Sequence, residues 1–361
     1  MSLSCKDENG YTYAIKDFRK SLQPFLFKIV SKGVVMGYDS SLRNMATDKE
    51  LTELSKSEHP VLRASAFREI LYRKSFNHFD VLMNHLDDTA IVATDAGEFG
   101  IWDRTVSDDI IEEAKWETDE AKNKTIELVL TKHNYLRSAY LILLEIEPQE
   151  KYYPSIKDMA TRPRRMSDNG YELEFYDIER AMYGLANFKK PEDVKIIKRQ
   201  MMQKISELSY VSFRLMKEFP DTAYFDVLQR YHRRQFYKFS GNRRGGFSGY
   251  IQDRADPEDF IQALVMQQSD KSAKLLDTIL NRLPLQTCLP DKDYILKEVM
   301  MEIREHPCPA YKKLLEKIEL KVEQGLRSQI ISPRDSAYLS DLAHDSPFKI
   351  PADTAKEKIR W

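Results

Sequence analysis

One short pattern of residues occurs twice in this chain, at 59–67 and 133–140, and it limits the fold more than any other feature. Both copies begin with His, carry Leu and Arg at the fourth and fifth positions, and continue into small residues and an aromatic one. The copies lie 74 positions apart, about twice the ~37 residues of a helical-hairpin repeat. Each such hairpin buries its apolar face only against the next one. The spacing therefore predicts stacked pairs of helices.

Signals that start helices stand beside these repeats. Thr47 and Glu50 have the spacing of a capping box, in which each side chain bonds a backbone N–H that the first turn leaves open. Pro60 suits the first turn of a helix, where its missing N–H costs nothing. We expect His59 and His133 to lie at equivalent helix starts.

Glycine and proline are scarce, and this scarcity argues against folds made of many short β-strands. The 361 residues include 12 Gly and 15 Pro, whereas a sandwich or barrel needs a turn about every ten residues. Because 42% of the residues are hydrophobic, the chain can bury a core, and we expect a mostly helical protein. Further helices are predicted at 120–132, 135–146, 172–187, 192–206, 222–238, 257–267, 271–283, 292–305 and 309–323.

The helical segments resemble HEAT repeats. The residues that carry this resemblance are Pro60, Val61, Arg63, Ala66 and Ile70 in the first copy, and Pro191, Asp193 and Val194 in a later helix. The copy at 133–140 departs from the pattern because it has no proline. The resemblance implies an all-α fold, an α-α superhelix of helical hairpins, and a role in binding other macromolecules. The layout is also similar to HEAT-like proteins of environmental bacteria, which adds no chemistry.

Two segments break the helical pattern. Residues 91–106 contain two β-prone runs around a glycine-bearing turn, which predicts a small β-hairpin inserted between helical repeats. Residues 239–256 hold four glycines and predict a long loop. We expect a flexible N-terminal tether at 1–12 and a C-terminal extension at 326–361. Between them we expect two sets of helical repeats, one at 13–160 that contains the hairpin and one at 171–325.

The balance of charges and the distribution of apolar residues indicate which partners and which cellular compartment to expect. The 56 Lys and Arg nearly equal the 57 Asp and Glu, so no basic excess points to nucleic acid, and no run of apolar residues is long enough to predict a transmembrane helix. Small residues lead into Cys5, and a polar acidic stretch follows it, as at the lipidated cysteine of a bacterial lipoprotein. We therefore expect a membrane tether through Cys5 at the cell envelope. The alternative is an ordinary frayed terminus and a cytoplasmic protein.

A basic aromatic patch between 227 and 254 is the main surface candidate. It combines seven Lys or Arg with one acid and several aromatic rings, and guanidinium groups beside rings can bind phosphate, carboxylate or a partner surface. The alternative interpretation of these residues is that the aromatic rings are buried in the core and the arginines form a solvated face. The candidate residues are Arg230, Arg233, Arg234, Tyr237, Arg243, Arg244 and Phe247, with Trp102 and Asp103 of the hairpin as a rival site.

Seven acids between 108 and 120 form a dense carboxylate cluster. Paired carboxylates can serve a glycosidase or hold a metal, but acids on an amphipathic helix usually form a solvated face, and we expect that here. The seven histidines show no metal-binding spacing, and the glycine-rich loop fits neither a phosphate loop nor a GxSxG nucleophile elbow. The sequence therefore assigns no catalytic residue, metal or cofactor.

These observations favour a non-catalytic protein-interaction scaffold of helical-repeat type, although the sequence does not decide whether the chain is an enzyme. The alternative is a nucleic-acid-binding helical-repeat protein or base-repair enzyme that uses the basic aromatic patch at 230–250, since some HEAT-like solenoids resemble DNA glycosylases. A third interpretation, a hydrolase, would need Ser248 or the acids at 108–120 to face a cleft.

Replacing Arg243 and Arg244 with glutamate is expected to weaken partner binding if the basic aromatic patch holds an acidic partner, because two positive charges are reversed. The affinity would be measured at low salt, where contacts between charges are strongest. An unchanged affinity would remove the patch as a binding site.

Overall fold

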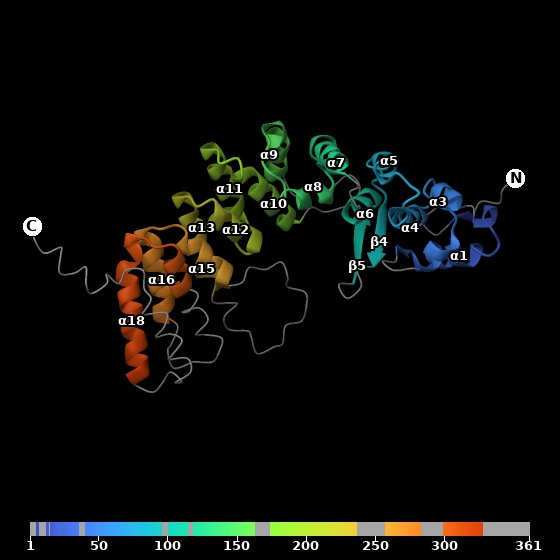
Figure 1. Cartoon of the computed structure of the whole chain (residues 1–361). Helices are drawn as coiled ribbons and strands as arrows, with labels where there is room; N and C mark the ends of the chain where they lie inside the picture. Colours follow the sequence, from blue (N-terminus) through green and yellow to red (C-terminus); the bar gives the residue numbers. More distant parts are fainter. Residues whose placement is uncertain are drawn as a thin grey trace, which may run out of the picture. The chain divides into compact units, whose positions relative to one another are not determined.

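The computed structural model describes residues 5–6, 12–13, 15–35, 40–95, 100–114, 118–162, 174–236, 257–282 and 299–327. The chain divides into two compact units, Met1–Ala181 and Met182–Trp361, here called unit 1 and unit 2. The described residues are mostly helical, as predicted, and unit 1 also contains a small three-stranded sheet (Figure 1).

Unit 1 consists of short helices that follow one another along the chain, with the sheet inserted among them. Its helices are η1 (Ile15–Asp17), α1 (Gln23–Lys32), α2 (Ser40–Met45), α3 (Asp48–Leu54), α4 (Pro60–Leu71), α5 (His78–Met83), α6 (Val106–Glu113), α7 (Asp119–Lys132), α8 (Arg137–Ile142), η3 (Glu150–Tyr152), α9 (Tyr153–Thr161) and the greater part of α10 (Phe175–Ala186). Helix α4 packs against α3 and α6, and α6 packs against α8.

Unit 2 contains the remaining helices. They are α11 (Pro191–Gln203), α12 (Tyr210–Glu218), η4 (Thr222–Tyr224), α13 (Phe225–Tyr231), the π-helical turn η5 (His232–Phe236), α15 (Pro257–Val265), α16 (Asp270–Arg282), η7 (Pro309–Tyr311) and α18 (Lys312–Arg327), with a further helical stretch at 299–305. Helix α15 packs against both α12 and α16. Three aromatic rings form the centre of this packing, since Phe213 and Phe260 both contact Tyr231.

The predicted hairpin at 91–106 is confirmed, and the structure adds a strand to it. Strands β4 (Ile91–Asp95) and β5 (Ile101–Thr105) pair antiparallel and lie side by side next to α6 (Figure 1). Strand β3 (Val34–Val35) pairs parallel to β4, which gives the order β3-β4-β5. The sequence did not predict β3 because two valines are too short a run to be distinguished from the end of a helix.

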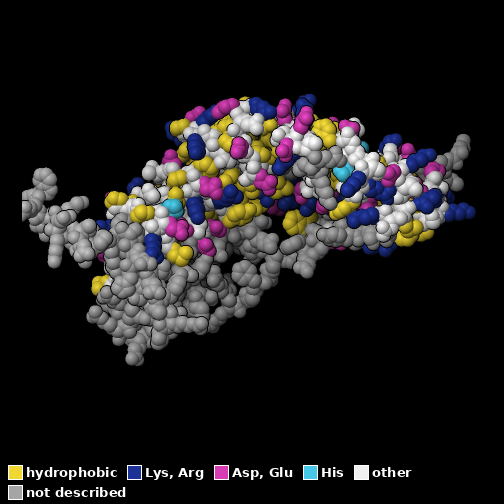
Figure 2. All heavy atoms as spheres, viewed as in Figure 1, with side chains coloured by type: hydrophobic (Ala, Val, Ile, Leu, Met, Phe, Trp, Pro, Cys, Tyr) yellow, Lys and Arg dark blue, Asp and Glu magenta, His cyan; other side chains and the backbone are white. Residues whose placement is uncertain are grey.

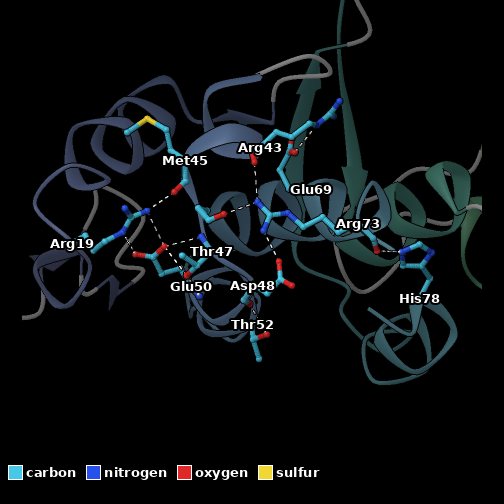
Figure 3. Close-up of polar contacts among 11 residues, drawn as sticks. Arg19, Arg43, Met45, Thr47, Asp48, Glu50, Thr52, Glu69, Arg73 and His78 are labelled. Carbon is cyan, nitrogen blue, oxygen red and sulfur yellow. Dashed lines mark hydrogen bonds and ion pairs between the residues drawn. The ribbon is translucent and has the colours of Figure 1, made fainter. Parts of the chain in front are cut away.

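A network of polar contacts fixes the start of α3 (Figure 3). The Thr47 hydroxyl accepts the Glu50 N–H at 3.3 Å and the Glu50 carboxylate accepts the Thr47 N–H at 2.8 Å, so the predicted capping box is confirmed. Arg19 Nε donates to the same carboxylate at 2.7 Å. This bond, together with the hydrogen bonds from Thr47, lowers the pKa of Glu50 to about 2. Arg73, just beyond α4, donates to Asp48 in the first turn of α3.

The two copies of the sequence repeat do not begin their helices at the same position. Pro60 is the first residue of α4, as predicted, and His59 is its N-cap. His133 is instead the C-cap of α7, and α8 begins only at Arg137. Asn134 lacks the fixed φ that proline gives, and its side-chain amide donates to a serine of α9 at 2.7 Å. The expectation that His133 starts a helix is therefore wrong.

A buried carboxylate joins α6 to α4 and to the sheet. Asp109 is 0% exposed and accepts two hydrogen bonds from Arg68, from Nε at 2.9 Å and from Nη2 at 2.7 Å. The Thr94 hydroxyl of β4 donates to Asp109 Oδ1 at 3.2 Å. Such a two-point contact compensates the loss of hydration that burial imposes on both charges.

The preceding carboxylate joins α6 to α8. Asp108 Oδ1 accepts both the backbone N–H and the hydroxyl of Ser138, each at 2.8 Å, and Oδ2 accepts the Thr105 hydroxyl at 2.8 Å. The N-cap position of α8 is held by Leu136, which has no side-chain oxygen to bond the first turn. Asp108 therefore caps α8 from the neighbouring helix.

A third carboxylate joins α8 to α10. Asp177 Oδ1 lies 3.0 Å from Arg180 Nη1 on its own helix and 4.0 Å from Arg137 Nε at the start of α8. Its side chain is 2% exposed, and burial raises its pKa above the ordinary value. We call Asp108, Asp109 and Asp177 the carboxylate ladder, because together they join α4, α6, α8 and α10 in order.

The interpretation of the acids at 108–120 as a solvated face is wrong for Asp108 and Asp109, which belong to the carboxylate ladder, and holds for the exposed acids of the set. Asp108 and Asp109 are buried, Glu113, Asp119 and Glu120 are exposed, and Glu117 lies outside the described residues. Helix α6 is buried on all sides from Val106 to Ile111, so its first acids face neighbouring helices. The sequence signal that could have shown this is the apolar flanking of the two aspartates, by Val106 on one side and by Ile110 and Ile111 on the other.

Replacing Arg68 with methionine is expected to lower the free energy of unfolding of unit 1 by about 3–5 kcal/mol, because Asp109 then stays buried without its partner. The double variant Arg68→Met, Asp109→Leu should regain most of this loss, since no buried charge remains. Urea denaturation would be followed by tryptophan fluorescence, because Trp102 and Trp116 both belong to unit 1.

The control is Glu113→Gln, which removes a carboxylate 3.6 Å from Arg68 whose side chain is 41% exposed. This change should alter stability by no more than about 0.5 kcal/mol. Equal effects of Arg68→Met and Glu113→Gln would contradict the importance of the carboxylate ladder.

Candidate functional site

Three consecutive residues of β5 are exposed, with Ile101 and Asp103 on one face of the strand and Trp102 on the other. Ile101, Trp102 and Asp103 lie in the edge strand of the sheet, and no other described strand pairs with its outer side. Ile101 is 63% exposed and Trp102 is 38% exposed. We call these three residues the hairpin ledge. It includes the two hairpin candidates from the sequence, Trp102 and Asp103, and adds Ile101, which pattern reasoning did not select.

Side chains of α6 and α8 support the hairpin ledge. Arg104 Nη1 lies 2.7 Å from Glu112 Oε2 on α6. The Arg137 guanidinium of α8 lies 5.5 Å from the centre of the Trp102 ring, within cation–π range. Trp102 is the register partner of the buried Thr94, so both belong to the same face of the sheet. Because Arg137 is also part of the last step of the carboxylate ladder, that ladder helps to fix the position of Trp102.

Glu112 is an acid of this region whose pKa is raised by its surroundings. Its side chain is 20% exposed, and burial raises its pKa above the ordinary value of 4.5 despite the opposing effect of Arg104. The neighbouring Asp108 and Asp109 also raise the pKa of Glu112, each with a smaller effect than that of Arg104. The ion pair with Arg104 therefore stabilises a carboxylate in a place that disfavours negative charge.

An open groove of about 1080 Å³ borders the same helices. It is lined by residues of α6, α7 and α8 and of the segment that leads into η3. We call it the α7–α8 groove. Its half-exposed apolar lining is Ile126, Leu141, Ile142 and Ile146, and its acidic lining is Glu112, Asp119, Glu120, Glu127, Glu145 and Glu147. Sequence reasoning missed this groove, because its apolar residues come from separate helices.

The basic aromatic patch is described only in part. Arg233 and Arg234 are exposed in η5, and Arg230 is half-buried in α13. The Tyr231 ring is buried and lies 4.8 Å from that of Phe213, so this aromatic residue of the patch belongs to the core. The other candidates, Tyr237, Arg243, Arg244 and Phe247, lie outside the described residues. Binding by the patch stays a prediction.

A smaller cavity of about 370 Å³ lies in unit 2, between the end of α10, the start of α11 and the end of α12. Its polar lining includes Lys189, Lys190, Asp193, Glu218 and Asp221. Glu218 accepts a hydrogen bond from the Tyr183 hydroxyl and also pairs with Arg214. Charges of both signs line this cavity, so it does not select a ligand by charge.

One group of potential metal ligands was not expected from the sequence. Glu302, Glu305 and His306 each place a ligand atom within 4.8 Å of the other two. Lys217 Nζ lies 4.0 Å from Glu302, and its positive charge opposes a cation at this place. A Glu-x-x-Glu-His spacing at the end of one helix is the signal that could have found the group.

The N-terminal candidate Cys5 lies in β1 (Cys5–Lys6), which pairs antiparallel with β2 (Thr12–Tyr13). Its lipidation stays a prediction. Across the part of the chain that the structure describes, no helix combines the length and the apolar character that crossing a membrane requires.

No protein-family model, curated protein or solved structure matches this chain. On the face shown in Figure 2, the described basic and acidic side chains are interspersed, without a broad field of one sign. This face does not present the continuous basic stripe that a nucleic-acid backbone favours.

Glu112→Gln and Glu50→Gln are expected to change stability with opposite pH dependence. The folded pKa of Glu112 is raised, so the stability of the wild type relative to Glu112→Gln should fall as the pH rises above 4.5. The pKa of Glu50 in the folded protein is about 2, below its ordinary value of 4.5. The wild type should therefore lose its stability advantage over Glu50→Gln as the pH falls from 4.5 to about 2. Urea midpoints across this pH range measure both effects. If the stability of the wild type relative to each variant changed with pH in the same direction, the burial of Glu112 would be contradicted.

Proposed function

We propose that this chain is a non-catalytic protein-interaction scaffold, built from HEAT-like helical hairpins that stack as an α-α superhelix. The observation that carries the proposal is the hairpin ledge. Ile101 and Trp102 are exposed on an edge strand, where apolar side chains are costly unless a partner covers them. Trp is also among the residues that most often dominate the energy of protein interfaces.

The packing order of the helices supports the repeat architecture. In unit 1, α4 packs on α6 and α6 on α8, so every second helix contacts the next in the series. Pro60 and Pro191 each occupy the first position of a helix, as the HEAT resemblance implies. The carboxylate ladder follows the same series, which is the arrangement expected when each hairpin depends on its neighbour for burial.

The pairing of the buried acids supports a structural role for them. The carboxylate of Asp109 is bonded by Arg68, and that of Asp108 by a backbone N–H and two hydroxyl groups. A general acid or base must be within reach of a substrate proton, whereas these two carboxylates are enclosed between helices. The hairpin ledge is accessible, and its chemistry suits contact better than proton transfer.

The test compares capture of partners by the full-length protein and by the double variant Ile101→Asp, Trp102→Ala. Proteins from the source cell would be bound to each immobilised protein and quantified by mass spectrometry. Loss of a central Trp typically costs 2 kcal/mol or more, so recovery of a specific partner should fall by about 30-fold. The matched control is Phe27→Ala, which removes a ring that is 44% exposed on α1.

Capture that falls in the hairpin-ledge variant and stays at the wild-type level in Phe27→Ala supports the proposal. Equal capture by both variants would exclude the hairpin ledge as the contact surface. Absence of any protein enriched by the wild type over an unrelated protein would overturn the scaffold function itself.

A further inference from the structure

The α7–α8 groove has an apolar floor that the packing of unit 1 leaves open. Ile126 on α7, Leu141 and Ile142 on α8, and Ile146 beyond α8 line it and are each half-exposed. Their side chains come from two helices that pack on each other. A shallow apolar channel between two helices is the shape that a third helix fills with its own apolar stripe.

The rim of this groove carries carboxylates that no described group neutralises. Glu112 pairs with Arg104, and Glu127 pairs with Lys151 at 2.9 Å. Four further acids line the groove, namely Asp119, Glu120, Glu145 and Glu147. None of these four makes an ion pair or a side-chain hydrogen bond with another described residue. Of the three lysines that line the groove, Lys151 is already paired. The rim therefore has an excess of negative charge.

We propose that the α7–α8 groove binds a basic amphipathic helix of a partner protein, an inference that rests on the scaffold function and names the partner's chemistry. The helix places apolar residues at i, i+3, i+4 and i+7 on the isoleucine and leucine floor. Lysine or arginine residues beside that stripe meet Glu145 and Glu147, which follow α8, and Asp119 and Glu120 in the first turn of α7. Charge complementarity of this kind selects the partner and orients it.

The groove and the hairpin ledge are adjacent through one residue. Glu112 lines the groove and also pairs with Arg104 of β5. A partner that places a helix in the groove therefore has its flanking residues near the edge strand. The two surfaces are nevertheless distinct, because none of the three residues of the hairpin ledge lines the groove.

The probe for this proposal is a fluorescein-labelled peptide of leucine and lysine, about 18 residues long, with leucines in the helical pattern above. Its binding to the full-length protein would be measured by fluorescence anisotropy. We expect Glu145→Lys, Glu147→Lys to raise the Kd about tenfold or more, because two attractive contacts become repulsive. Added salt should also raise the Kd of the wild type.

The matched control is Glu53→Lys, Glu58→Lys, which reverses the same number of charges at exposed positions of unit 1 outside the groove. This control should bind the peptide like the wild type. A peptide with the same composition in scrambled order tests whether the apolar stripe is needed, and a leucine–glutamate peptide tests the sign of the charge. Equal affinity for either peptide, or equal Kd values for the two charge-reversal variants, would overturn the proposal.

Two further outcomes separate this proposal from others. If the wild type forms a dimer in sedimentation and Glu145→Lys, Glu147→Lys abolishes it, the occupant is a second copy of this chain and the proposal is wrong. If partner capture is lost in Ile101→Asp, Trp102→Ala but persists in Glu145→Lys, Glu147→Lys, the scaffold function stands and the groove is not its docking site.

Discussion

The structure of unit 1 depends on carboxylates that have been removed from water. A buried carboxylate loses several kcal/mol of hydration and becomes favourable only when its partners are held in the right geometry. Asp109 finds those partners on α4 and β4, and Asp108 finds them on α8. A shift of any one helix would leave a charge or an amide unsatisfied. The relative placement of α4, α6 and α8 is therefore more strongly determined than apolar packing alone would make it.

The two proposed contact surfaces lie on this fixed set of helices. Trp102 rests beside Arg137, which also approaches Asp177, and Arg104 is bound to Glu112 on α6. The α7–α8 groove is walled by the helix that Asp108 caps. A surface whose supports are already ordered loses little conformational entropy when a partner binds. The buried charges thus contribute to recognition without touching the partner.

Features encoded by neighbouring residues could be predicted from the sequence. The capping box of Thr47 and Glu50, the helix start at Pro60 and the hairpin at 91–106 each depend on a few adjacent residues. The burial of Asp109 depends on Arg68, which is 41 positions away. The apolar neighbours Val106, Ile110 and Ile111 indicate burial of this segment, but no local pattern identifies Arg68 as the partner. The same holds for the groove, whose walls are separate helices.

The cap that α8 takes from Asp108 also bears on how the chain is made. Helix α8 has only six residues, and so short a helix is unstable by itself in water. The N–H and hydroxyl of its Ser138 find their acceptor, Asp108, only after α6 is in place. During synthesis α6 leaves the ribosome before α8, because it comes earlier in the chain. The direction of translation thus matches the order in which these two helices need each other.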